Sequence, residues 1–155
     1  MTLNKVIYFD MDGTLCDFYG VEGWLDCLIA RNPLPYEIAK PLHNLSALAR
    51  RLNNLQKQGW KIGIVSWLAK NSTAEFDQKV TETKRKWLAK HLGSVKFDEI
   101  KIVPYGTPKS TVADMKNGIL FDDEANNLTE WEENGGLAFL PMNITNTLKW
   151  ARKVA

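Results

Sequence analysis

Five short apolar runs recur along the sequence, separated by longer polar stretches with helical spacing. The first run, Val6 to Phe9, is continuously apolar and β-favouring, and an acidic, glycine-containing turn follows it. Such a run predicts a strand that is buried on both faces. Together the runs predict strands over 5–10, 61–66, 100–103, 119–121 and 137–140. This alternation of strands and helices indicates an α/β fold with a doubly wound parallel sheet of about five strands.

Two long helices are predicted between the first three strands. The leucines from position 45 to 55 recur at spacings of three and four, and Gly59 then supplies a helix stop. This pattern predicts a helix that packs one face on the sheet. The stretch 73–92 has a similar helical pattern and ends before Gly93.

The segment 16–41 does not fit this alternation. It is rich in aromatic residues and proline and is too long for an ordinary connection, so we interpret it as a small inserted cap. A chain of 155 residues with 45% hydrophobic content can bury one sizeable core but hardly two. The sequence therefore predicts a single domain over 1–155, with a minimal cap at about 16–41.

The charge pattern favours a small-molecule partner. Twenty basic and eighteen acidic side chains nearly cancel, and neither sign forms a long block. Nucleic acid and an anionic membrane are therefore not the expected partners. The apolar run at 6–9 is too short for a signal peptide or a membrane span, so we expect a cytoplasmic protein.

The cysteines and histidines are too few for a soft metal site. Cys16 and Cys27 could pair, but in a chain that can build its own core we expect reduced, partly buried thiols. With only His43 and His91 and no CxxC pair, a structural zinc site lacks ligands. Any metal here is expected to be hard and bound by oxygen.

The densest group of chemically useful residues is Asp10-Met11-Asp12-Gly13-Thr14, which directly follows the first predicted strand. A glycine here lets the chain turn sharply, so that two carboxylates meet at the strand end. In isolation these aspartates could simply cap a turn by accepting hydrogen bonds from nearby backbone amides.

Three further positions lie where the predicted sheet should bind a ligand. Ser66, Lys109 and the Asp122-Asp123 pair each end a predicted strand or begin the next helix, on the edge where open α/β sheets hold ligands. Together with DMDGT and ILFDD, their order and spacing resemble the four motifs of the haloacid dehalogenase superfamily. The resemblance spans nearly the whole chain. It implies a Rossmann-like core, a magnesium ion and nucleophilic attack by the first aspartate.

The two aspartates of DMDGT have separate expected roles. Asp10 would attack phosphorus and form an aspartyl-phosphate, with a divalent ion reducing the repulsion between the anions. Asp12 would give a proton to the leaving oxygen and later take one from water, and its backbone carbonyl could ligate magnesium. The resemblance implies phosphatase rather than dehalogenase chemistry, because dehalogenases of the superfamily lack an acid at the position of Asp12.

The phosphate site is expected to contain Ser66 and Lys109, grouped with Met11 and Trp67. Ser66 offers a hydroxyl donor and Lys109 a positive charge to the transferring phosphoryl group. In isolation Lys109 could be an exposed lysine at a helix start, and Ser66 a strand-end turn residue.

The magnesium ligands are expected among Asp10, Asp12, Asp122 and Asp123. The sequence leaves open which residue of the Asp122-Asp123 pair touches the ion directly. The pair could instead cap the helix from Glu124 onward, and the two roles can coexist.

The substrate is less constrained than the chemistry. Lys84, Trp87 and Leu88 before Gly93, followed by Lys109 and ILFDDEANN, resemble the 5'(3')-deoxyribonucleotidases, which implies a nucleoside monophosphate as substrate. Those enzymes carry a multi-helix cap, whereas 16–41 has room for one or two short helices. A more open site would admit a phosphorylated nucleic-acid end or a phosphoprotein, and a binding module without turnover is a further alternative.

Aromatic residues of the cap are candidates for substrate contact. Phe18, Tyr19 and Trp24 follow the nucleophile closely in the sequence and could stack on a base or exclude water. They could equally pack a small core of the cap.

Overall fold

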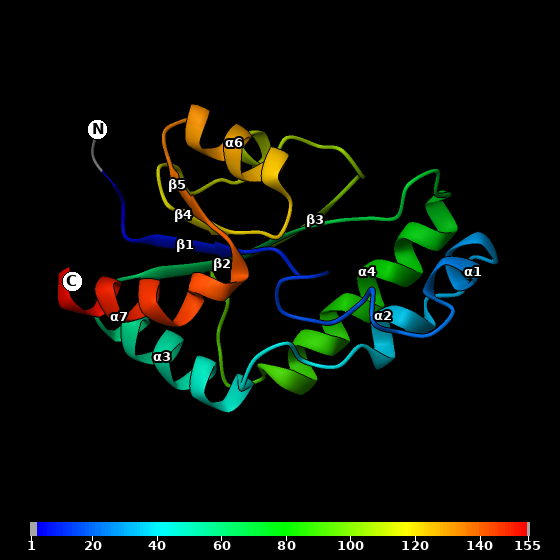
Figure 1. Cartoon of the computed structure of the whole chain (residues 1–155), viewed down its shortest axis with the longest axis horizontal. Helices are drawn as coiled ribbons and strands as arrows, with labels where there is room; N and C mark the ends of the chain where they lie inside the picture. Colours follow the sequence, from blue (N-terminus) through cyan, green and yellow to red (C-terminus); the bar gives the residue numbers. More distant parts are fainter. Residues whose placement is uncertain (1–2, 155) are drawn as a thin grey trace.

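The computed structural model describes residues 3–154, and its centre is a five-stranded parallel sheet (Figure 1). The strand order is β3-β2-β1-β4-β5. The strands are β1 (Val6–Phe9), β2 (Lys61–Trp67), β3 (Glu99–Val103), β4 (Ile119–Phe121) and β5 (Leu137–Phe139). The predicted α/β fold is confirmed, and no predicted strand differs from the observed one by more than one residue at either end.

The central strand β1 is buried on both faces, which explains its continuous apolar run. Ile7 and Phe9 point into a larger core, whereas Val6 and Tyr8 point into a smaller core on the opposite face. Because helices cover both faces of the sheet, a polar group on β1 must find a partner inside the protein, as the Tyr8 hydroxyl does by donating to Glu99 at 2.9 Å.

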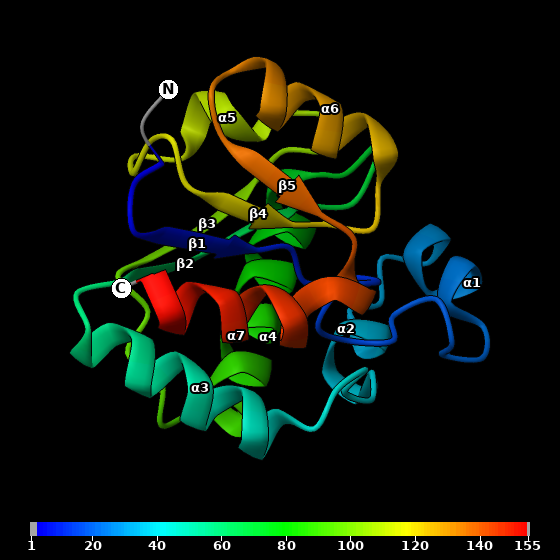
Figure 2. The same cartoon turned by 60° about the vertical axis from the view of Figure 1, so that its left-hand side comes forward.

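Helices form a layer on each side of the sheet (Figure 2). The larger core lies beneath α3 (Leu45–Lys57), α4 (Ala74–His91) and α7 (Ile144–Val154). The smaller core lies beneath α5 (Lys109–Val112) and α6 (Ala125–Glu133). A short 3-10 turn, η1 (Pro141–Asn143), precedes α7. This arrangement confirms the doubly wound topology.

The two long predicted helices are confirmed as α3 and α4. Each begins at a side-chain cap that satisfies a free backbone N–H. The Asn44 side chain accepts a hydrogen bond from the N–H of Ala47, and the Thr73 hydroxyl accepts one from the N–H of Phe76.

The segment 16–41 contains two short helices, α1 (Trp24–Ile29) and α2 (Leu34–Ile38), on the side toward which the strands point (Figure 1). Its two ends lie together. Cys16 forms an isolated antiparallel β-bridge with Pro41, and the N–H of Asp17 donates a hydrogen bond to the Lys40 carbonyl at 2.7 Å. A third apolar cluster joins the segment to α4 and β2; its buried members are Phe18, Tyr36, Leu68, Phe76 and Val80.

The strand register determines which side chains meet at the carboxyl edge of the sheet. Phe9 of β1 lies opposite Ile64 of β2 and Phe121 of β4. The residues that follow these three positions therefore emerge side by side, among them Asp10 and Asp122.

Both cysteines have free thiols, Cys16 buried and Cys27 partly buried. Over residues 3–154, none of the helices combines the length and the apolar character needed to cross a membrane.

Candidate active site

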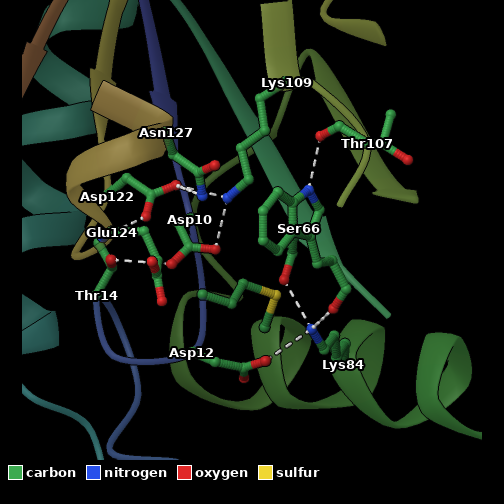
Figure 3. Close-up of polar contacts among 12 residues, drawn as sticks. Asp10, Asp12, Thr14, Ser66, Lys84, Thr107, Lys109, Asp122, Glu124 and Asn127 are labelled. Carbon is green, nitrogen blue, oxygen red and sulfur yellow. Dashed lines mark hydrogen bonds and ion pairs between the residues drawn. The ribbon is translucent and has the colours of Figure 1, made fainter. Parts of the chain in front are cut away.

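Asp10 occupies the carboxyl end of β1 and is held by three hydrogen bonds, of which the two to its carboxylate are drawn in Figure 3. Its backbone N–H donates to the carbonyl of Phe121 at 2.9 Å. Oδ1 accepts a hydrogen bond from Lys109 at 2.9 Å, and Oδ2 accepts one from the Thr14 hydroxyl at 3.1 Å. Only 6% of Asp10 is exposed. The carboxylate is therefore fixed in orientation at the base of a cavity.

Lys109 links two of the predicted motifs. It is the first residue of α5, it is 1% exposed, and its Nζ also donates to Asp122 Oδ2 at 2.7 Å. Burial alone would lower the pKa of Lys109, but the adjacent carboxylates of Asp10 and Asp122 outweigh it and raise the pKa. The interpretation of Lys109 as an exposed lysine at a helix start is wrong.

Asp122 and Asp123 differ in their partners. Asp122 is fully buried: Oδ2 also accepts from the Asn127 amide at 3.1 Å, and Oδ1 accepts from the N–H of Glu124 at 2.9 Å. Asp122 thus binds the start of α6 as well as Lys109, so the predicted contact with the helix start is present. Asp123 is only partly buried, and neither Lys109 nor Asn127 donates to it.

Three carboxylates converge where a cation would fit. Asp10, Asp122 and Asp123 can each offer one oxygen within 4.8 Å of the others, and no other such group of acids, histidines or cysteines occurs in the described part of the chain. Burial and the negative charges of Asp10 and Asp122 raise the pKa of Asp123 to about 8. A ligand set of carboxylate oxygens suits a hard ion such as Mg²⁺, which would relieve this crowding of negative charge.

Gly13 allows the carboxylates to approach. Its φ is +79°, a backbone conformation that glycine adopts at no steric cost. A Cβ at this position would lie 2.3 Å from Oδ2 of Asp123. The glycine of DMDGT is therefore needed for the turn and also for the space beside Asp123.

Asp12 lies apart from the three converging carboxylates and is paired with a lysine. Its Oδ2 accepts a hydrogen bond from Lys84 at 3.0 Å, and its Oδ1 lies 3.6 Å from the Cys16 thiol. Burial raises the pKa of Asp12, Lys84 opposes the shift, and the charge of Asp10 adds to it. A raised pKa suits a group that must start as an acid.

Lys84 was not among the site residues predicted from the sequence, where it entered only through the nucleotidase resemblance. It lies in the middle of α4, is 1% exposed, and also donates to Ser66 Oγ and the Trp67 carbonyl, each at 2.7 Å. The helical pattern contained a signal, because Lys84 is four residues after Val80, on the buried face of the helix.

The remaining predicted phosphate-site residues lie at different depths. Trp67 lines the cavity, donates from Nε1 to the Thr107 carbonyl at 2.8 Å, and has Lys109 Nζ 5.4 Å from its ring centroid. Ser66 is fully buried behind the cavity wall, against Lys84. The Met11 side chain packs in the larger core, which leaves only its backbone for a ligand.

The cavity above these carboxylates has a volume of about 590 Å³. Its walls are mainly aromatic and aliphatic, and two exposed cations, Arg31 and Lys70, also line it. The aromatic residues of the segment 16–41 differ in their burial. Phe18 is buried against Tyr36 in the third cluster, whereas Tyr19 remains 52% exposed beside the cavity, with Trp24 next to it.

No protein-family model matches the chain, and no curated protein matches its sequence. The likeness that exists is structural.

Solved structures similar to this chain include phosphatases and a haloacid dehalogenase-like hydrolase. A D,D-heptose 1,7-bisphosphate phosphatase from B. bronchiseptica, complexed with magnesium and phosphate, is 13% identical with a TM-score of 0.55; the match covers 88% of this chain and 80% of that one. The same phosphatase from Burkholderia thailandensis is 12% identical, with a TM-score of 0.54 over 86% of this chain and 75% of that one.

A haloacid dehalogenase-like hydrolase from Streptococcus pneumoniae is 11% identical, with a TM-score of 0.53 over 92% of this chain and 97% of that one. At such identities the likeness shows a shared fold. The chain therefore has the haloacid dehalogenase-like fold. This agrees with the fold that the resemblance implies, and none of these structures is a deoxyribonucleotidase.

Proposed function

We propose that this chain is a magnesium-dependent phosphomonoester hydrolase that forms an aspartyl-phosphate on Asp10. The observation that carries the proposal is the environment of the Asp10 carboxylate. Lys109 and Thr14 orient it, it lies at the base of a cavity, and two further carboxylates stand beside it. A fixed carboxylate next to a cation site is suited to attack a phosphate ester.

In the first step, an oxygen of Asp10 forms a bond to phosphorus as the bond to the ester oxygen breaks. Asp12 donates its proton to that leaving oxygen, so an alcohol departs. Lys109 offsets negative charge on the transferring group. The N–H of Met11, which donates to no group within residues 3–154, is available to a phosphate oxygen.

In the second step, water replaces the alcohol. Asp12, now a carboxylate, takes a proton from the water, whose oxygen bonds to phosphorus as the bond to Asp10 breaks. Inorganic phosphate leaves, and Asp10 and Asp12 return to their starting forms.

The magnesium ion would be held by Asp10, Asp123 and the backbone carbonyl of Asp12, with Asp122 supporting the site. Both oxygens of Asp122 are already occupied by donors, whereas Asp123 is free of Lys109 and Asn127. When bound, the ion reduces the repulsion between carboxylate and phosphate. The B. bronchiseptica phosphatase of this fold is complexed with magnesium and phosphate, which supports a magnesium and phosphate site here.

The segment 16–41 is the proposed cap, and nucleoside monophosphates are the proposed substrates. A cavity of about 590 Å³ is within the usual size of small-molecule sites, about 300–1,000 Å³, which favours a small ester over a macromolecule. Tyr19 and Trp24 on one side, and Trp67 and Tyr105 on the other, offer aromatic surfaces for a base.

The test is release of phosphate by the purified protein, with magnesium and with a chelator. The substrates are p-nitrophenyl phosphate, glycerol phosphate, and a panel of 5'- and 3'-mononucleotides. Magnesium-dependent release is expected, and mononucleotides should have the highest kcat/KM. The variant Asp10→Asn should lose turnover while keeping the fold, because the amide is not a nucleophile.

Three outcomes would count against the proposal in different ways. Activity retained by Asp10→Asn would remove Asp10 from its role. If a folded protein that binds magnesium releases phosphate from no ester, the binding module is favoured. Release without preference for nucleotides would support the phosphatase activity but reject nucleoside monophosphates as the substrates.

A further inference from the structure

Lys84 is a buried lysine with its three N–H donors engaged. It lies on α4 among apolar neighbours, with 1% of its surface exposed, and the face of the Tyr36 ring lies 5.1 Å from Nζ. A buried ammonium is costly unless it is paired and fully hydrogen-bonded. The three acceptors, at 2.7–3.0 Å, meet that condition (Figure 3).

The three acceptors come from two separate parts of the sheet edge. Asp12 belongs to the turn after β1, whereas the Ser66 hydroxyl and the Trp67 carbonyl belong to the end of β2. Lys84 and Asp12 are 72 positions apart in the sequence. One side chain from a helix thus connects the proposed general acid to the neighbouring strand.

Asp12 needs such a connection because it lies in a turn rather than in a strand or helix. A general acid works only within hydrogen-bond reach of the leaving oxygen, and small displacements are costly in rate. The neighbouring thiol of Cys16 is a weak donor, so Lys84 is the strong donor that orients this carboxylate.

We propose that Lys84 is the positioning residue for the general acid: it holds the Asp12 carboxylate toward the leaving group by connecting it to Ser66 and Trp67 at the end of β2. The inference rests on the proposed phosphatase activity. Lys84 acts through Asp12 and does not line the cavity, in contrast to Lys109.

The role predicts a dependence on the leaving group. An ester with a weakly basic leaving oxygen, such as p-nitrophenyl phosphate, needs little protonation, whereas glycerol phosphate needs a well-placed acid. The quantity to measure is kcat/KM, because it reports the steps up to formation of the aspartyl-phosphate. A purely structural lysine would lower kcat/KM for all esters alike.

The experiment compares wild type, Lys84→Met, Asp12→Asn, the double variant, and Lys86→Met as a control on the exposed face of α4. For Lys84→Met we expect a loss of about 100-fold with glycerol phosphate and of about 3-fold or less with p-nitrophenyl phosphate. The double variant should be no slower than Asp12→Asn, because residues acting as one unit are not additive. Lys86→Met should match wild type.

Each alternative outcome is decisive. The role of Lys84 is overturned if Lys84→Met lowers kcat/KM equally for both esters. It is also overturned if the loss in the double variant equals the product of the two single losses. Neither result contradicts the phosphatase activity. A wild type that hydrolyses neither these two esters nor any mononucleotide of the panel overturns the proposed function and this inference with it. If Lys84→Met does not fold, Lys84→Arg provides the same comparison, since it keeps the charge but not the three-donor geometry.

Discussion

Lys109 and Asp10 are 99 residues apart in the sequence, yet Nζ of Lys109 lies 2.9 Å from Oδ1 of Asp10. The same ammonium lies 2.7 Å from Asp122, so one buried cation separates two buried carboxylates. This contact unites the first and last predicted motifs, so the stability of the site and the proposed activity should depend on the same residue.

Lys109→Met should damage both properties. Removing one partner of a buried pair costs about 3–5 kcal/mol. We expect about 3 kcal/mol at neutral pH, because burial raises the pKa of Asp122 and lets this carboxyl group protonate. The loss in kcat/KM should be about 100-fold or more. Urea unfolding at pH 5 and pH 7 and phosphate release provide the measurements, with exposed Lys149→Met as control. Full activity in Lys109→Met would exclude Lys109 from the phosphate site.

Asp123→Asn should stabilise the metal-free protein at alkaline pH. The folded-state pKa of Asp123 is about 8, against an ordinary value of 3.8, so the folded state binds this proton more tightly than the unfolded state. Stability from this group is therefore present below about pH 4 and is lost as pH rises to about 8. The neutral amide avoids that loss.

The measurement is urea unfolding at pH 5 and pH 9 in chelator, and again with magnesium. The free energy of unfolding of Asp123→Asn should exceed that of wild type at pH 9. The difference between the two proteins should be smaller at pH 5. Wild type alone should gain a large increase in the urea midpoint of unfolding from magnesium. An equal magnesium response in both proteins would contradict Asp123 as a ligand.

Gly13→Ala should impair magnesium-dependent turnover by about 10-fold or more. A Cβ at this position would lie 2.3 Å from the Asp123 carboxylate and would therefore displace it. Gly59 provides a matched control: its φ is +93°, and a Cβ there would meet nothing within 4 Å. Both substitutions strain the backbone, at about 1–2 kcal/mol. Thermal unfolding and phosphate release should show that only Gly13→Ala loses activity; equal activity losses would reject the steric explanation.

Tyr19→Ala should weaken nucleotide recognition. Tyr19 is half exposed, packs edge-on against Trp24 at 5.2 Å between centroids, and lines the cavity. Loss of one base-stacking surface is worth about 1–3 kcal/mol, which corresponds to a rise in KM of about 5-fold or more. Kinetics with mononucleotides and with glycerol phosphate measure this, and Trp150→Ala on the far helix α7 is the control. A similar change for glycerol phosphate would exclude stacking.

The sequence predicted the sheet well because its strands are buried on both faces. A parallel sheet covered by helices requires continuous apolar runs, and those runs can be read without knowing their neighbours. Asp10, Lys109 and the Asp122-Asp123 pair were found for a related reason: each lies at a strand end or a helix start, and parallel strands bring such positions to one edge.

By itself, then, the sequence determined the α/β fold and the identity of most polar side chains at the carboxyl edge. Only the tertiary structure decided which of those side chains contact one another and which reach the cavity. Lys84 pairs with Asp12, Asp122 pairs with Lys109, and Ser66 lies behind the cavity wall. The physical reason is that strand position depends on local hydrophobic pattern, whereas the partner of a buried charge depends on how distant elements pack.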